Sequence, residues 1–215
     1  MFISASDERL SFCGAVSVQK TSNWCKPWRM PWQDIELYPP QMLGHLQMPA
    51  GVRIRFATDS VNLKLIPAPL SDNGQMDLVI DNEIIETVEY LQTDEEIIFA
   101  PLPAGKKVVE LWLSQRMPIS VCGIVIDDNA MIEKSEDTRP KWITYGSSIT
   151  QCGAAASPAA TWPGIVARTR DLNLTCLGFG GQCHGDPVIL KMISDLPSDI
   201  VSLCLGNNVR WTVTP

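Results

Sequence analysis

The chain contains few of the residues that most metal sites and many catalytic mechanisms require. Its 215 residues include only two histidines, His45 and His184, so a mechanism with a histidine base has two candidates. Seven cysteines are present, but the number is odd and no pair has CxxC spacing. This pattern argues against a disulfide framework and a zinc knuckle. We therefore interpret the cysteines as free thiols and predict no metal site.

Features of membrane proteins and nucleic-acid-binding proteins are also missing. No apolar run approaches the ~18 residues that a membrane span needs, and the first ten residues lack the basic start and apolar core of a secretory signal. Acidic residues outnumber basic ones by 24 to 17, which disfavours nucleic acid and anionic membranes as partners. With 45% hydrophobic residues, the composition is that of a folded protein, which we expect to be cytoplasmic.

The first 130 residues show the pattern of short strands. Apolar and polar residues alternate over 52–56, 61–65 and 109–113, which predicts strands with one buried face. Turn-forming residues at 71–74 and 103–105 separate these and other short apolar runs. We expect residues 1–130 to form a jelly-roll-like β-sandwich built from strands alone.

A polar, charged segment at 131–140 is interpreted as a linker, and the pattern changes after it. Buried strands are predicted at 142–145, 174–177 and 199–205, with one helix capped by Thr161 and another over 187–195. Alternating strands and helices are typical of a parallel α/β unit. The predicted fold class is therefore α+β with two domains, a β-sandwich followed by an α/β domain at 141–215.

Small polar residues follow each of the three predicted parallel strands. The first loop contains Ser147 and Ser148, the second is the glycine-rich segment 178–181, and the third is Gly206-Asn207-Asn208. Because ligands bind beyond the carboxyl ends of parallel strands, we expect the three loops to form one site. A hydroxyl, backbone N–H groups and a carboxamide are the groups that acyl transfer requires.

These loops resemble the sequence blocks of the SGNH/GDSL hydrolases. Residues 145–150 are similar to the first block, 177–182 to the second and 205–208 to the third. The resemblance covers roughly 140–209, and the tryptophan-rich segment 27–32 resembles the N-terminal sandwich of one bacterial branch. It implies a partial flavodoxin-like hydrolase domain without a cofactor. The implied site residues are Ser148 as nucleophile and Gly181 and Asn208 as oxyanion-hole donors. Because Ser147, Gln182 and His184 lie beside these positions in the sequence, we also expect them to line the substrate pocket.

The family pattern is incomplete in this chain. Ser147 stands where the first block usually has Asp, and Val209 stands where many members have Asp. The closing Asp-x-x-His block, which supplies the base and its orienting acid, does not occur in the 215 residues. We interpret the sequence as C-terminally truncated, the shortened product of a longer gene in preference to a natural fragment, and expect impaired activity. His184 follows the second block closely, whereas His45 is interpreted as a structural residue of the sandwich.

The function implied by the resemblance is hydrolysis of carboxylic esters, with acetyl esters of carbohydrates among the substrates left open. The alternative is a non-catalytic sandwich that binds a glycan or a protein beside a degenerate hydrolase remnant. A third interpretation is a homo-oligomer that pairs through the open sheet edge at 199–205. All three predict a small-molecule, carbohydrate or protein partner rather than nucleic acid or a membrane.

Overall fold

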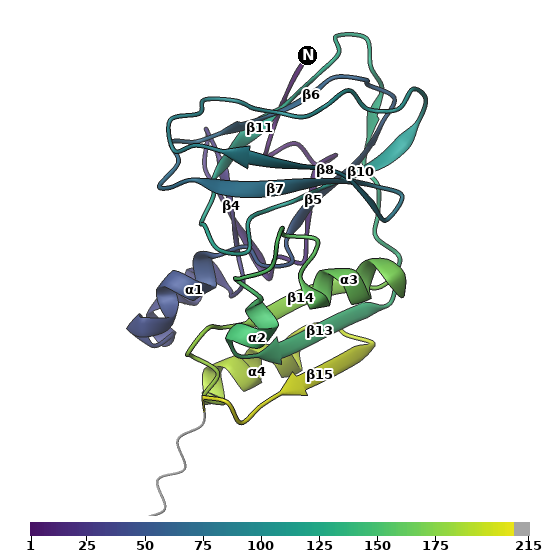
Figure 1. Ribbon diagram of the computed structural model, residues 1–215. Helices are drawn as coiled ribbons and strands as arrows, with labels where there is room; N and C mark the ends of the chain where they lie inside the picture. Colours follow the sequence, from purple (N-terminus) through teal and green to yellow (C-terminus); the bar gives the residue numbers. More distant parts are fainter. Residues whose placement is uncertain (209–215) are drawn as a thin grey trace, which may run out of the picture.

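Two antiparallel sheets form the N-terminal part of the chain in the computed structural model, which describes residues 1–208 (Figure 1). The first sheet has the order β3-β4-β11-β6-β9, with β1 also paired to β11. Its strands are β1 (Phe2–Ser4), β3 (Ser17–Lys20), β4 (Cys25–Trp28), β6 (Leu63–Pro67), β9 (Ile97–Ile98) and β11 (Val121–Ile126).

The second sheet has the order β12-β5-β10-β7-β8, with β2 also paired to β5. Its strands are β2 (Ser11–Cys13), β5 (Arg53–Thr58), β7 (Gly74–Ile80), β8 (Glu83–Tyr90), β10 (Lys107–Trp112) and β12 (Ile132–Glu133). Alternate residues of both sheets, such as Leu65 and Leu111, meet in one buried apolar core. The predicted sandwich is confirmed.

The segment 32–47 departs from the expectation that this region consists of strands alone. It forms η1 (Trp32–Leu37), η2 (Pro40–Met42) and α1 (Leu43–Gln47). Tyr38, Met42 and Leu46 lie in a core shared with the later α/β part, not in the sandwich core. The alternation of apolar and polar residues within the segment could not predict this, because its apolar side chains pack against residues that are distant in the sequence.

A parallel sheet of order β14-β13-β15 follows, and the predicted α/β unit is confirmed. Its elements are β13 (Lys141–Gly146), α2 (Ser148–Gln151), α3 (Trp162–Thr169), β14 (Asn173–Gly178), α4 (Pro187–Asp195) and β15 (Ile200–Cys204). Thr161 caps α3 as predicted, since its Oγ1 accepts a hydrogen bond from the Gly164 N–H at 3.1 Å.

Opposite faces of the parallel sheet carry separate cores. Trp142 packs with Ala167 of α3 on the face that also meets Trp112 of the sandwich. Ile143, the next residue of β13, packs with Ile189 of α4 on the other face. This follows from the period of two in a strand. Figure 1 shows the sandwich resting over the α2 and α3 side of the sheet.

The segment interpreted as a linker is an ordered part of the fold. Its strand β12 pairs with β5, and its Asp137 accepts a hydrogen bond from Arg53 at 2.9 Å in a buried ion cluster. Arg139 binds both Asp137 and Glu110 in the same cluster. Each buried charge in the cluster is paired with an opposite charge in place of water. The cluster therefore holds residues 137–139 at the junction of the two parts.

Strand β15 is the edge of the parallel sheet within the described residues, and Ile200, Val201 and Leu203 on it are 45 to 54% exposed. Pairing of two chains through this edge stays a prediction. All seven cysteines are free thiols, as expected. Among residues 1–208, no helix is long and apolar enough to cross a membrane. Val209 and the segment 210–215 lie outside the described residues.

Candidate functional site

The carboxyl ends of the three parallel strands lie side by side. Gly146 at the end of β13 is in register with Gly178 at the end of β14 and with Cys204 at the end of β15. The loops that continue from these positions therefore leave the sheet at one edge, as the sequence predicts. They carry Ser148, Gly181 and Asn208.

Ser147 and Ser148 have different surroundings although they are neighbours. Ser147 is 1% exposed and is the N-cap of α2, where its Oγ accepts a hydrogen bond from the Ile149 N–H at 3.4 Å. Ser148 is the first residue of α2 and is exposed. The buried serine is thus used by the helix, and the exposed one is available to a ligand.

Two glycines shape the loop after β14. A Cβ on Gly178 would lie 2.1 Å from the backbone nitrogen of Gln151, so only glycine lets α2 approach the strand this closely. Gly181 has a φ of +68° and open space around its Cα, so glycine is favoured there by backbone conformation. The N–H groups of Ser148 and Gly181 donate no hydrogen bond to another residue in the 1–208 range. Both remain available to an oxyanion.

Asn208 lies against the loop that follows Gly181. Its Oδ1 accepts a hydrogen bond from the Cys183 N–H at 3.4 Å, which leaves its Nδ2 group as a donor. Nδ1 of His184 lies 3.0 Å from the backbone oxygen of Asn208, and the His184 side chain is exposed. Gln182 is half-buried, and its Oε1 has no partner among the described residues. His184 therefore lies against the third loop, and no hydrogen bond joins it to Ser148 among the described residues.

His45 is closer to the serine than the sequence indicates. It belongs to α1, and its Nδ1 lies 3.2 Å from Oε1 of Gln151 in α2. The same Oε1 accepts a hydrogen bond from the Gly180 N–H at 2.8 Å. A Cβ built on Gly180 would lie 3.3 Å from Cε1 of His45 and 3.6 Å from Cβ of Ser148. His45 is therefore at the junction of both parts and not inside the sandwich.

A cavity of about 290 Å³ opens beside Ser148. Its walls come from both parts of the chain, since Met48 and Met117 belong to the N-terminal part and Gln151 to α2. The remaining lining residues are His45, Arg116 and Gly153. Sequence reasoning missed all of these except the serine. Gln151 alone carried a signal, because a residue three positions after Ser148 in a helix shares its face.

Arg29 joins the N-terminal part to the end of β14. Its buried guanidinium donates to the backbone oxygens of Cys176, Gly178 and His45 at 3.1, 2.6 and 2.5 Å, and stacks over the ring of Phe179. Burial lowers the pKa of Arg29 to about 10, which still leaves it charged at neutral pH. One side chain thus holds both α1 and the strand end from which the glycine loop starts.

Both parts of the chain match known protein families. Residues 10–118 match the N-terminal domain of SsfX3, and residues 140–213 match the GDSL-like lipase/acylhydrolase family. The chain belongs to the SGNH/GDSL hydrolase family. Its N-terminal β domain is of the SsfX3 type. The family resemblance predicted from the three loops is confirmed.

Solved structures agree with this membership. The chain is similar to the salicylyl-acyltransferase SsfX3 from a tetracycline biosynthetic pathway, with 36% identity over 97% of this chain and a TM-score of 0.89. A GDSL-like lipase from Bacteroides ovatus is 20% identical over 97% of this chain and 65% of its own, with a TM-score of 0.78. A family two carbohydrate esterase from Clostridium thermocellum is 12% identical over 93% of this chain and 66% of its own, with a TM-score of 0.63. The last two show the fold alone.

The chain spans 64% of the length of SsfX3. No curated protein sequence matches it. Within residues 1–208, no three His, Cys, Asp or Glu side chains cluster as metal ligands would.

Proposed function

We propose that the protein transfers acyl groups from carboxylic esters through Ser148, with water as the acceptor in hydrolysis. The observation that carries this proposal is the exposed Ser148 hydroxyl at the strand-end edge, facing a cavity that both parts of the chain line. A serine at such a position can attack an ester carbonyl carbon, forming an acyl–enzyme and releasing the alcohol. Water then attacks the acyl–enzyme and releases the acid.

The groups around Ser148 suit the negative charge that develops on the carbonyl oxygen. Within residues 1–208, the N–H groups of Ser148 and Gly181 and the Nδ2 group of Asn208 donate no hydrogen bond to the protein. Fixed donors of this kind stabilise an oxyanion without reorganising during the reaction. Removal of one donor typically lowers the rate about 10²–10³-fold. The methionines of the cavity favour an apolar acyl group.

The attack also requires a base that takes the serine proton. The 215 residues contain no Asp-x-x-His block, and of the two histidines only His45 lines the cavity beside Ser148. We therefore expect this chain to hydrolyse esters slowly. Added imidazole supplies a base from solution, so it is expected to raise the Ser148-dependent rate.

The test is p-nitrophenyl acetate hydrolysis by the wild type, Ser148→Ala and Ser194→Ala, each with and without imidazole. Ser194 is an exposed serine of α4 whose hydroxyl, among the described residues, donates only to the backbone oxygen of Lys191, so its variant is a matched control. We expect wild type and Ser194→Ala to respond to imidazole, and Ser148→Ala to match the enzyme-free rate. Equal rates for wild type and Ser148→Ala would remove the enzymatic proposal and favour a non-catalytic binding protein.

Sugar acetates are one substrate class within this proposal. Its support is the cavity that both parts of this chain line, together with the fold that the chain shares with a family two carbohydrate esterase from Clostridium thermocellum. An aryl acyl donor is the competing class, because SsfX3 is described as a salicylyl-acyltransferase. Competition between p-nitrophenyl acetate and either acetylated xylan fragments or a salicylyl ester would separate the two classes.

A further inference from the structure

Five consecutive N–H groups, those of residues 179–183, run along the loop after β14. Four of them donate hydrogen bonds, namely those of Phe179, Gly180, Gln182 and Cys183. Within residues 1–208, the N–H of Gly181 donates none. The loop therefore presents one free donor, and the hydrogen bonds on either side of it determine where that donor lies.

The free donor lies at the centre of a tight turn. The Gln182 N–H donates to the oxygen of Phe179 at 3.1 Å, so Gly180 and Gly181 are the two central residues of the turn. Of the two, only Gly181 has a positive φ, of +68°, which is the pattern of a type II turn. Type I and type II turns differ in the orientation of the peptide between the central residues. The N–H of Gly181 belongs to that peptide, so its direction depends on how Gly180 is held.

Gln151 holds Gly180 from the side of α2. The Gly180 N–H donates to Oε1 of Gln151 at 2.8 Å, and Gln151 is only 7% exposed. Gly180 also lies directly beside Ser148, since a Cβ built on it would lie 3.6 Å from Cβ of the serine. Ser148 and Gln151 are the first and last residues of α2 and share a face of it. One short helix thus carries both the serine and the group that holds the glycine loop.

The protein uses the whole hydrogen-bonding capacity of the Gln151 carboxamide. Besides the Gly180 N–H, its Oε1 contacts Nδ1 of His45 in α1 at 3.2 Å. Its Nε2 donates to the backbone oxygen of Gln115 at 3.3 Å and to Sδ of Met48 at 3.1 Å. A carboxamide has two acceptor lone pairs and two N–H donors, so none is left for a ligand. Gln151 therefore affects a ligand through the groups that it holds.

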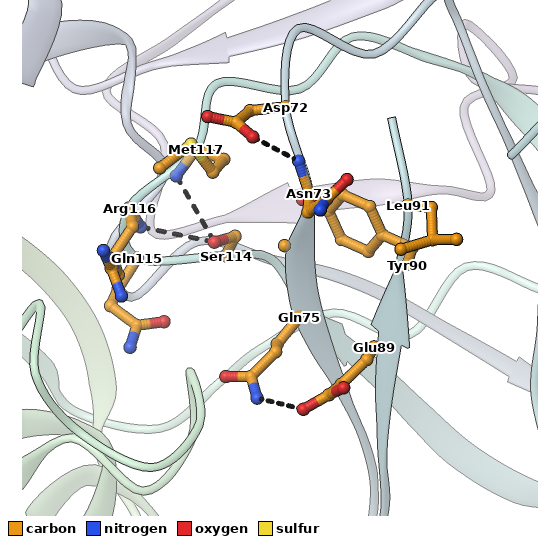
Figure 2. A pocket seen from close by; sticks show the side chains of 11 residues that line it. Asp72, Asn73, Gln75, Glu89, Tyr90, Leu91, Ser114, Gln115, Arg116 and Met117 are labelled. Atoms are coloured by element: carbon orange, nitrogen blue, oxygen red, sulfur yellow. Dashed lines mark hydrogen bonds between the residues drawn. The ribbon is translucent and has the colours of Figure 1, made fainter. Parts of the chain in front are cut away.

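The loop that supplies the Gln115 oxygen is itself fixed. Figure 2 shows this loop where the chain leaves β10, with the Ser114 Oγ accepting hydrogen bonds from the N–H groups of Arg116 and Met117, both at 3.3 Å. The Gln151 carboxamide is thus anchored on a closed loop of the sandwich and on α1. These anchors limit the positions that the Gly180 N–H can take.

We infer that Gln151 is a positioning residue of the proposed reaction, which holds the Gly180 amide so that the Gly181 N–H meets the oxyanion beside Ser148. This inference rests on the proposed function. An oxyanion donor contributes most when it is already in place, because no reorganisation is then needed during the reaction. The N-terminal part of the chain thereby supports the chemistry, through its contacts with Gln151.

Gln151→Met tests this role, because it removes every hydrogen bond of the carboxamide and leaves an unbranched side chain of similar length. Gln151→Glu keeps an acceptor for the Gly180 N–H and loses both donors. Gln47→Met is the matched control. Gln47 is a half-buried glutamine of α1 whose side chain, within residues 1–208, bonds only residues 26 and 43. Urea unfolding verifies that each variant is folded under the assay conditions.

Amide hydrogen exchange of the ¹⁵N-labelled chain measures whether Gln151 holds the loop, without requiring turnover. In Gln151→Met the Gly180 N–H is expected to exchange about fivefold faster than in the wild type, the effect of losing one hydrogen bond. Gln151→Glu and Gln47→Met should keep the slow exchange of Gly180. Equal exchange in Gln151→Met and the wild type would overturn the inference.

Imidazole-supported hydrolysis of p-nitrophenyl acetate measures the consequence for the reaction, once the rate of Ser148→Ala is subtracted. We expect Gln151→Met to lower kcat about 10–100-fold, because the oxyanion donor is present but no longer fixed. KM should change less than about twofold, since the contact forms in the transition state. Gln151→Glu should lose less than Gln151→Met, and Gln47→Met should match the wild type.

A thionoester distinguishes positioning from a purely structural role. Its sulfur accepts hydrogen bonds weakly, so hydrolysis of p-nitrophenyl thionoacetate gains little from the N–H groups. Gln151→Met should therefore slow the ester far more than the thionoester, whereas general damage to the fold would slow both equally. Equal losses for the two substrates would reject the positioning role.

The results also separate this inference from the proposed function. Ser148-dependent hydrolysis that Gln151→Met leaves unchanged would reject the role of Gln151 and keep the proposed reaction. A wild type without any Ser148-dependent rate would reject the proposed reaction. Faster exchange of Gly180 in Gln151→Met would then still show that Gln151 holds the glycine loop.

Discussion

Asp77 is a buried carboxylate that joins the sandwich to the α/β part. It is 0% exposed and forms no ion pair with the described residues. Its Oδ2 accepts hydrogen bonds from the Ser157 hydroxyl at 2.7 Å and the Ala159 N–H at 2.6 Å, and its Oδ1 accepts from Thr87 at 2.6 Å. Three donors, two of them from the loop before α3, thus replace water around one charge.

The structure predicts different costs for two substitutions of Asp77. In Asp77→Asn the amide nitrogen can face Thr87, whose hydroxyl can turn to accept, so the loss is about 1 kcal/mol. Asp77→Ala removes every acceptor and leaves the Ala159 N–H buried without a partner. Since each hydrogen bond to a charged group contributes about 1.5–3 kcal/mol, the loss is roughly 3 kcal/mol or more.

Urea and thermal unfolding measure these losses. For a chain of this size, about 3 kcal/mol corresponds to a fall in melting temperature of about 6–12 °C. Asp34→Ala, an exposed aspartate in η1, is the control and should stay within about 0.5 kcal/mol of the wild type. Equal losses for Asp77→Asn and Asp77→Ala, or a loss below about 1 kcal/mol for Asp77→Ala, would refute the reasoning.

Two further outcomes are expected. Gly178→Ala places a Cβ 2.1 Å from the Gln151 nitrogen, so it should lower the free energy of unfolding by roughly 2–3 kcal/mol or more, measured in urea. Gly44→Ala is the control, because a Cβ there meets open space and should cause no such loss. Equal losses for the two variants would contradict the predicted clash. Burial would raise the pKa of Asp137, but the hydrogen bond from Arg139 and nearby arginine charges lower it to about 2. The ionised Asp137 therefore stabilises the folded chain by about 2 kcal/mol; this contribution is fully present above about pH 4 and is lost as the pH falls through 2. In Asp137→Asn the free energy of unfolding, measured in urea, should vary less with pH between about 2 and 4. A pH profile equal to that of the wild type would contradict the assigned role of Asp137.

The candidate site was predictable where its residues follow strands closely in sequence. The loops after β13, β14 and β15 could be aligned because parallel strands place their carboxyl ends together. The difference between Ser147 and Ser148 was not predictable, because helix capping turns one hydroxyl inward and leaves the next outward. The position of Gly181 in the loop after β14 was predictable, and its role as a backbone donor stays a prediction. The Gln151 contact that holds Gly180 depends on α2 lying against β14, so it was not predictable.

By itself, the sequence determined the sandwich, the change to a parallel α/β unit near residue 140, and the family to which the chain belongs. Periodicity and short motifs carry that information, because both depend on neighbours within a few positions. Only the tertiary structure decided that His45, Met48 and Arg116 line one cavity with Ser148, and that Arg29 and Asp77 join the two parts. Those contacts connect residues that are far apart in the chain, and no local pattern encodes which distant surface a side chain will cover.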